Sequence, residues 1–353
     1  MTTVLVPSAG GPGCVNLTRS LHAIDGVETV GFDASPHYLH LAETKTRLLG
    51  PRRDDPDFLH FVNRVVTEQS VDFIFPNNSL DGALLTRNAS HLAAPVFLPS
   101  ARAFDVGENK WETFLLLRKL GIPAPGTLLI DSPQDLEKAL DLFGSPIWVR
   151  GSGIPGKGVG VASLPARNLQ QATAWVDYWS GWGKMAASQY LPGDNLTWLG
   201  VFDGGKLVAS QGRQRDAYVI PHVSPSGITG APAISHTVHR DDINALGPQV
   251  CLAVDPHFTG PAFVDFKGDE NGEPQVTEIN IGRFGTTHHF YTVAGCNFPQ
   301  LVLALGLGLK TPDWAATENV LPADLFWVRT LDAGPALVTA PQLKQLNRTG
   351  RIP

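Results

Sequence analysis

The chain has 353 residues, and at roughly 150 residues per domain this length suggests two or three domains. Hydrophobic residues make up 43% and charged residues 17%, which is enough apolar material for a core and too little charge for a disordered chain. Lys and Arg number 27 against 33 Asp and Glu, so no basic excess favours nucleic-acid binding. The three cysteines are too widely spaced for a disulfide framework, the N-terminus has no signal-peptide pattern, and no apolar run is long enough to span a membrane. We therefore expect a cytoplasmic protein without a membrane or nucleic-acid partner.

Short apolar strands alternate with helical patterns over about the first 100 residues. The strands are expected at residues 3–7, 27–32, 71–76 and 96–98, and the helices at 15–24 and 58–68. This alternation is typical of a parallel, doubly wound sheet. A helix is predicted over residues 109–120, and the segment Gly-Ile-Pro-Ala-Pro-Gly that starts at Gly121 indicates a boundary, because it cannot continue that helix.

Beyond this boundary the pattern changes twice. A strand, a helix and a strand are expected at residues 127–130, 133–142 and 146–150, followed by a glycine-rich loop (151–163) and a helix (168–179). From about residue 186 onward, strands broken by Gly turns predominate, with helices near 241–252 and 299–307 and hairpin turns at 203–205 and 269–272. The pattern therefore changes near residue 121 and again near residue 186.

A glycine-rich turn of sequence Gly-Gly-Pro-Gly follows the first strand from Gly10, and Asp33 ends the second strand. Glycines in this place let backbone N–H groups approach a pyrophosphate, and a later acidic residue can bind a ribose. The third glycine of that dinucleotide pattern is missing, because Asn16 stands in its place. NAD binding and a tight strand-to-helix turn without a cofactor both stay open.

A second glycine-rich segment follows the apolar strand that ends in Arg150, with Gly156, Lys157 and Gly158 in its middle. Glycines allow positive φ and a row of free N–H groups that suits a polyphosphate, and two flanking cations would offset its charge. The spacing is not the Walker pattern. On its own the segment is compatible with phosphate binding or with a surface loop.

The predicted hairpin around the Asn-Gly turn at 271–272 carries acidic and amide side chains. Asp265 lies near the end of one strand, and Glu278 and Asn280 lie in the next. Residues two apart in a strand project from the same face, so the hairpin would gather these oxygen ligands, which Mg²⁺ prefers. Arg283 follows within reach. A solvated hairpin face is the alternative, but the apolar residues that flank these positions favour a metal site.

The histidines do not match a metal site. His236 and His239, and the adjacent pair His288 and His289, lack the i, i+4 spacing of a helical zinc site. Most of them are expected to be ordinary polar or partly buried residues, and His288 or His289 could line a substrate pocket. No Ser-His-Asp or Cys-His arrangement can be read from the residue order, so nucleophilic catalysis is not expected.

The order of these segments over about residues 1–310 resembles the ATP-grasp superfamily, within it the carbamoyl-phosphate-synthetase-like and biotin-carboxylase-like branch. The resemblance implies a mixed α/β and α+β architecture, an ATP-grasp fold with an N-terminal Rossmann-like pre-ATP-grasp domain. The glycine turn of that domain contacts substrate more often than dinucleotide in the family. The resemblance implies three units. Residues 1–105 would be the pre-ATP-grasp domain, 106–185 the small lobe with its glycine-rich lid loop, and 186–353 the large lobe with the metal site and the C-terminal tail.

The resemblance also implies a nucleotide site. Lys110 matches the family's lysine at the start of the helix before the boundary, and Arg150 stands where family members usually have a second lysine. Together with Lys157 and the loop that contains Gly156 and Gly158 they would hold the phosphates. The adenine hinge matches Gln189, Tyr190 and Leu191, with Gln189 where Glu is common, and the ribose-binding residue falls on Asp194 or Asn195.

The remaining matches concern metal and substrate. The metal set carries over onto Asp265, Glu278 and Asn280, and Arg283 matches the arginine after the Glu-x-Asn motif, one position later than usual. Arg213 and Arg215 lie on the strand that the family uses to face phosphates or substrate. With Arg283 they are the expected catalytic residues.

The resemblance implies an ATP-dependent ligase that uses ATP with Mg²⁺, or Mn²⁺ in its place. A small-molecule carboxylic acid would be activated as an acyl phosphate and attacked by an amine, with release of ADP and phosphate. A homodimer would fit the family. The alternatives are carbamoyl-phosphate-type phosphorylation of bicarbonate or carbamate, an NAD-dependent oxidoreductase that uses the glycine turn, and a non-catalytic ADP-sensing module.

Overall fold

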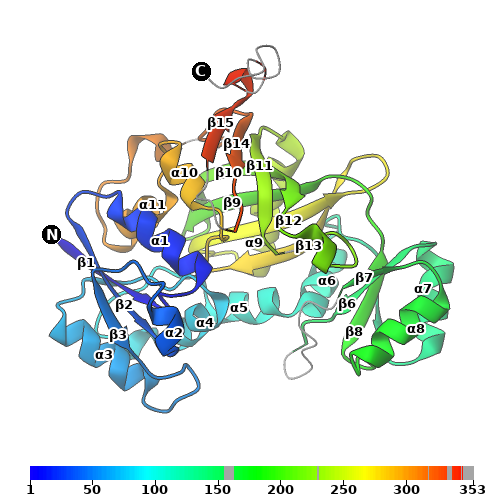
Figure 1. The fold of residues 1–353 in the computed structure, drawn as a ribbon, viewed down its shortest axis with the longest axis horizontal. Coiled ribbons are helices and arrows are strands. Elements are labelled where there is room, and N and C mark those ends of the chain that lie inside the picture. The colour runs from blue at the N-terminus through cyan, green and yellow to red at the C-terminus, as the bar shows by residue number, and fades with distance from the viewer. Residues whose placement is uncertain (155–162, 229, 317, 332–335, 343, 345–353) are drawn as a thin grey trace.

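The structure is a computed structural model that describes residues 1–154, 163–228, 230–316, 318–331, 336–342 and 344. The described residues form three sheets, which lie in different parts of the molecule (Figure 1). The N-terminal sheet and the second sheet lie at opposite ends, and the largest sheet lies between and above them in this view. The helices α5 (Ala101–Glu108) and α6 (Lys110–Lys119) run between the two ends.

The N-terminal sheet is parallel, with the order β3-β2-β1-β4. Its strands are β1 (Thr2–Pro7), β2 (Val27–Asp33), β3 (Thr46–Leu49) and β4 (Phe73–Ile74), and its helices are α1 (Pro12–His22), α2 (Pro36–Leu39), α3 (Phe58–Glu68) and α4 (Ser79–Arg87). Alternate residues of β1 enter different cores: Leu5 packs in the cluster that holds the apolar face of α3, and Val4 and Val6 pack with Leu17 of α1. The chain therefore covers both faces of the sheet with helices, as the alternation predicts.

The predicted strand at residues 96–98 is wrong, because the structure forms no strand there. Pro95 and Pro99 flank this segment, and prolines have no N–H to donate to a ladder. A short edge strand, β3, forms where none was predicted. Its sequence Thr-Arg-Leu-Leu lacks an apolar run, and β3 pairs with β2 alone.

The second sheet is antiparallel, with the order β5-β8-β6-β7. It consists of β5 (Thr127–Ile130), β6 (Ile147–Gly151), β7 (Leu164–Ala166) and β8 (Met185–Gln189), together with the helices α7 (Pro133–Phe143) and α8 (Leu169–Tyr178). Ile147 and Val149 of β6 are fully buried against Leu136 of α7 and Val176 of α8. The strand that ends in Arg150 is thus anchored by its apolar residues, and Gly156, Lys157 and Gly158 of the following loop lie outside the described residues.

The largest sheet is antiparallel, with the order β13-β12-β9-β10-β11-β14-β15. Its strands are β9 (Asn195–Asp203), β10 (Lys206–Tyr218), β11 (Pro232–Val238), β12 (Gly260–Gly268), β13 (Pro274–Ile281), β14 (Leu325–Val328) and β15 (Ala336–Thr339). Helix α9 (Asp241–Val254) packs on it where Gly247 meets the buried ring of Trp198; a Cβ on Gly247 would lie 2.3 Å from that ring. The helices α10 (His289–Val293) and α11 (Phe298–Gly306) pack beside α1, which ties this sheet to the N-terminal one.

Three short 3₁₀ segments, at Ala89–His91, Pro221–Val223 and Asp313–Ala316, complete the described elements. Within the described ranges, no helix is both long and apolar enough to cross a membrane.

Candidate active site

The hairpin of β12 and β13 brings its acidic residues face to face. Asp265 and Glu278 are directly opposed in the ladder, and Asn280 lies two residues further along β13. Glu278 Oε1 accepts a hydrogen bond from Lys110 Nζ at 2.8 Å, and Asp265 Oδ1 accepts one from Thr197 Oγ1 at 2.7 Å. Arg215 Nη2 lies 3.4 Å from Asp265 Oδ1. Two carboxylates and an amide therefore share one sheet face, in contact with cations from other elements.

Glu278 is held in its charged form. Burial alone would raise its pKa, but Lys110, Arg150 and Arg283 outweigh burial and hold the pKa below its ordinary value. The set of Asp265, Glu278 and Asn280 offers only hard oxygen ligands, so it fits Mg²⁺ and does not suit a softer metal. It contains only two carboxylates; no group of three His, Cys, Asp or Glu suited to a metal occurs in the described part of the chain.

Cations reach this hairpin from two further elements. Lys110 is the first residue of α6, whose N-cap Asn109 accepts a hydrogen bond from the Glu112 N–H. Arg150, near the end of β6, extends from the second sheet and donates from Nη2 to the Thr277 carbonyl of β13 at 3.0 Å. Burial lowers the pKa of Arg150. Both cations therefore lie beside the carboxylates, where a polyphosphate with its metal would need them.

The residues matched to the nucleotide hinge lie at the opposite end of the hairpin from Asn280. The Gln189 N–H at the end of β8 donates to the Gly126 carbonyl at 2.8 Å, and Leu191 is buried. Asn195 opposes Lys267, two positions from the pair of Thr197 and Asp265. The carbonyl of Asp194 accepts from the Gly268 N–H at 2.9 Å, and Tyr190 lies between these points, half-buried. Residues 189–195, which contain all five matched positions, thus connect β8 of the second sheet to β9 of the largest sheet at this end of the hairpin.

A buried group of polar side chains lies on β10 and the segment after β13. Arg213 is 6% exposed, and its guanidinium bonds Thr287 Oγ1 through Nη1. Among the described residues, several buried atoms here have no hydrogen-bond partner: Arg213 Nε, Arg215 Nε, Tyr218 Oη, Tyr291 Oη and His288 Nε2. No carboxylate of the described residues lies within ion-pair distance of Arg213. A buried cation without an ion pair, beside unsatisfied arginine N–H and tyrosine O–H groups that can donate, is the arrangement expected for an anionic ligand.

Arg329 joins this group and was missed by the sequence analysis. It follows β14, donates from Nε to the Pro232 carbonyl at 2.8 Å and from Nη2 to Thr286 Oγ1 at 3.4 Å. Burial and the nearby Arg213 lower its pKa. A signal was present: Phe-Trp-Val-Arg at its strand repeats the pattern Ile-Trp-Val-Arg that delivers Arg150.

Arg283 connects the hairpin to the N-terminal sheet. Its Nη2 bonds Asn280 Oδ1, its Nε donates to Ser79 Oγ at 3.0 Å, and its guanidinium lies 5.1 Å from the centre of the Phe263 ring. The next residue, Phe284, donates its N–H to Asn77 Oδ1 at 2.7 Å. The arginine after the Glu-x-Asn motif is thus fixed by residues that follow β4.

The glycine turn uses Asp33 for its own stability. The carboxylate of Asp33 accepts from the Gly10 N–H at 3.1 Å and from the Ser35 N–H at 2.9 Å. A Cβ on Gly10 would lie 2.0 Å from the Tyr38 carbonyl oxygen, so only glycine fits there. These contacts favour the tight-turn interpretation over a dinucleotide site.

His288 gives the fold a pH dependence that can be measured. Its Nδ1 bonds the Gly285 carbonyl at 2.7 Å, its ring stacks on Phe284, and burial lowers its pKa to about 3. Between pH 3 and 6.5 the unfolded chain binds a proton here and the folded chain does not, so stability falls as the pH drops below about 6.5. We expect His288→Asn to reduce the loss of unfolding free energy between pH 7 and pH 5 by about 2 kcal/mol in urea titrations. His222→Gln, at an exposed histidine, should leave that loss unchanged; an equal loss in wild type and His288→Asn would contradict the assignment.

The sequence similarity found between this chain and known proteins is weak. No protein-family model matches the chain. The chain is 24% identical over 279 residues to the carbamoyl phosphate synthase large chain of Sulfolobus acidocaldarius, an alignment that covers 72% of this chain and 24% of that protein. The chain therefore spans about a quarter of the length of this curated relative.

The structural likeness is much stronger. N5-carboxyaminoimidazole synthetase from Staphylococcus aureus, complexed with ADP, superposes with a TM-score of 0.69 at 15% identity, covering 93% of this chain and 81% of that one. An L-amino acid ligase from Bacillus licheniformis gives a TM-score of 0.67 at 17% identity, with 93% and 79% covered. The biotin carboxylase domain of 2-oxoglutarate carboxylase from Hydrogenobacter thermophilus, in complex with MgADP, ADP and bicarbonate, gives 0.69 at 12% identity, with 93% and 73% covered. The fold class predicted from the sequence is confirmed: this chain has the ATP-grasp fold, the fold of these ligases and carboxylases.

Proposed function

We propose that the protein is an ATP-dependent carboxylate–amine ligase. One observation carries the proposal: the opposed pair Asp265 and Glu278 faces Lys110 and Arg150, with the buried, unpaired Arg213 nearby. An oxygen-only metal set beside cations suits a metal-bound polyphosphate, and a further buried cation suits a second anion. The names of the structural neighbours, which include a synthetase and an amino acid ligase, support this class of reaction.

In this proposal the nucleotide lies between the second sheet and the hairpin. Asp265, Glu278 and Asn280 would hold Mg²⁺, which supplies neutralisation of the phosphate charge when bound. Lys110 and Arg150 would bind phosphate oxygens, as would Gly156, Lys157 and Gly158. The hinge from Gln189 to Leu191 would bind adenine through its backbone, and Asp194 or Asn195 the ribose.

The reaction proceeds in two displacements. A carboxylate oxygen of the acid attacks the γ-phosphorus, the bond to the β-phosphate oxygen breaks, and ADP leaves with that electron pair. The amine nitrogen then attacks the acyl carbon, the carbon–oxygen bond to phosphate breaks, and the nitrogen loses a proton to solvent. Arg213, Arg215 and Arg283 neutralise the transferred group, and Arg329 adds a further charge beside Arg213. Neutral His288 keeps Nε2 free to accept a hydrogen bond from the substrate.

A coupled assay of ADP release tests the proposal. Purified protein is incubated with Mg·ATP and a panel of carboxylic acids, each with and without amines, and the products are identified by mass spectrometry. ADP formation that needs both an acid and an amine, with an amide as product, supports the ligase. ADP formation with bicarbonate alone would instead support carbamoyl-phosphate-type chemistry. Binding of NADH in place of Mg·ATP would overturn the proposal.

A further inference from the structure

The hairpin of β12 and β13 forms one wall of a cavity, and residues of the N-terminal sheet form a second wall. A cavity of about 380 Å³ extends from Glu278, Asn280 and Arg283 to Ser8, Arg53 and Asn78 of the N-terminal sheet. Ser8 and Asn78 follow β1 and β4, and Arg53 follows β3. In open parallel sheets, ligands bind beyond the carboxyl ends of the strands. The N-terminal wall therefore lies where a substrate would be expected, and it shares one cavity with the proposed reacting centre.

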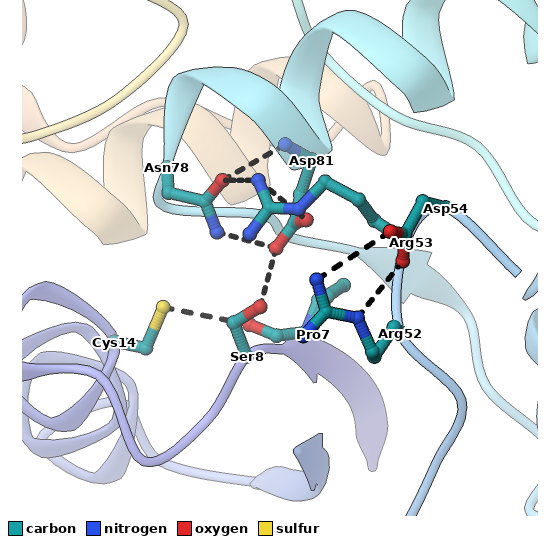
Figure 2. A network of polar contacts seen from close by, with 8 residues as sticks. All are labelled: Pro7, Ser8, Cys14, Arg52, Arg53, Asp54, Asn78 and Asp81. Carbon is teal, nitrogen blue, oxygen red and sulfur yellow. Dashed lines mark hydrogen bonds and ion pairs between the residues drawn. The ribbon is translucent and has the colours of Figure 1, made fainter. Parts of the chain in front are cut away.

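A buried carboxylate organises this wall (Figure 2). Asp81 is 1% exposed, and its Oδ2 accepts hydrogen bonds from Ser8 Oγ at 2.6 Å and from Asn78 Nδ2. Its backbone N–H donates to Asn78 Oδ1 at 2.8 Å. Ser8 has a φ of 51°, a left-handed conformation that a serine adopts at a cost, and the bond to Asp81 helps to hold it there.

The guanidinium group of Arg53 is held through one of its three nitrogens, Nη1. Its Nη1 lies 3.5 Å from Asp81 Oδ1 and 3.4 Å from Asn78 Oδ1, and its side chain is 40% exposed. Within the described ranges, the bonds of Arg53 involve Nη1 alone, so Nε and Nη2 remain for a ligand. The neighbouring Arg52 pairs with Asp54 on the surface and does not line the cavity. A guanidinium held by a buried carboxylate at a cavity wall is prepared to bind a carboxylate or phosphate bidentately.

We infer that Arg53, oriented by Asp81, binds an anionic group, a carboxylate or a phosphate, on one substrate of the ligase reaction. This inference rests on the proposed function for the identity of that molecule as a substrate. Ser8 and Asn78 complete the wall. The anionic group lies on the side of the cavity opposite Glu278 and Asn280. The substrate that carries it, either the acid or the amine, then extends across the cavity toward the hairpin of β12 and β13.

The inference can be tested by anion binding before the substrates are known. Inorganic phosphate and malonate are titrated by calorimetry into the protein, with and without saturating Mg·ADP. We expect Arg53→Gln to weaken the tighter of the two anions by about tenfold or more, and Arg52→Gln to stay within about twofold of wild type. Asp81→Asn, which leaves Arg53 in place and less well oriented, should weaken it severalfold. The anion that binds more tightly identifies the group as phosphate or carboxylate.

Two results separate this inference from the proposed function. Unchanged anion affinity in Arg53→Gln would overturn the inference, whatever the nucleotide does. If the wild-type protein binds no Mg·ADP, and Arg53→Gln still binds the anion more weakly than wild type does, the anion site stands and the ligase proposal fails. Thermal unfolding checks that each variant is folded, and Arg53→Lys, which keeps the charge, should recover part of the affinity if Arg53→Gln is unstable. Full wild-type affinity in Arg53→Lys would mean that charge alone binds the anion, and would count against bidentate binding.

Discussion

Replacing Glu278 by Gln is expected to lower the rate of ADP formation by about a hundredfold to a thousandfold. The change keeps the shape of the side chain but removes one of the two charges that face each other across the hairpin of β12 and β13. It also removes the counter-charge 2.8 Å from Lys110, so in the proposed site the metal loses a charged ligand and Lys110 loses the partner that positions it. The measurement is ADP release at saturating Mg·ATP with the acid and amine found in the screen.

A matched control lies on the same hairpin. Glu270 is exposed at the turn between the two strands, and Glu270→Gln removes the same charge without touching the cleft. It should retain activity within about twofold, as surface substitutions usually do. Raising the Mg²⁺ concentration should recover part of the activity of Glu278→Gln if this residue is a metal ligand. ADP formation at the wild-type rate in Glu278→Gln would remove Glu278 from the site.

The parts of the fold that local signals encode could be predicted from the sequence. The apolar run that ends in Arg150 forms β6, and the helix expected at residues 109–120 forms α6 (Lys110–Lys119), because an apolar pattern with a glycine stop needs no distant partner. The short strand β3 depends on pairing with β2, and no pattern in its own four residues reveals that partner. The segment at residues 96–98 has strand-forming residues but no ladder, because prolines flank it.

The residues of the candidate site also fall into two groups: those that local sequence signals predict, and those that only tertiary packing brings together. Asp265 and Glu278 could be assigned to neighbouring strands because a short turn joins those strands. The register set by the turn alone would place Thr277 opposite Asp265. A bulge between Asp265 and Phe266, which no sequence signal indicated, shifts the pairing by one residue and places Glu278 there. No sequence pattern pointed to Arg53 and Asp81, because the role proposed for them depends on a cavity between the N-terminal sheet and a hairpin far along the chain. That Arg213 forms no ion pair among the described residues is likewise a property of packing, since the sequence places Asp216 only three residues away. Asp216 bonds His236 instead, at 2.8 Å from Nδ1.

Replacing Arg213 by Met is expected to abolish activity while leaving the protein at least as stable. Arg213 is buried without an ion pair among the described residues, and burial lowers its pKa, so its charge costs free energy in the absence of an anionic ligand. Met has similar length and no charge, and we expect the midpoint of thermal unfolding to stay the same or rise. ADP formation should fall by about a hundredfold or more, since the transferred phosphate loses a desolvated cation, while Mg·ADP still binds. Lys206→Met, at an exposed position of the same strand, should change neither quantity. A large drop in the unfolding midpoint of Arg213→Met, with activity per folded molecule preserved, would mean that Arg213 stabilises the fold and takes no part in the reaction. Loss of turnover in a fully folded variant is the result expected if Arg213 binds an anionic substrate group.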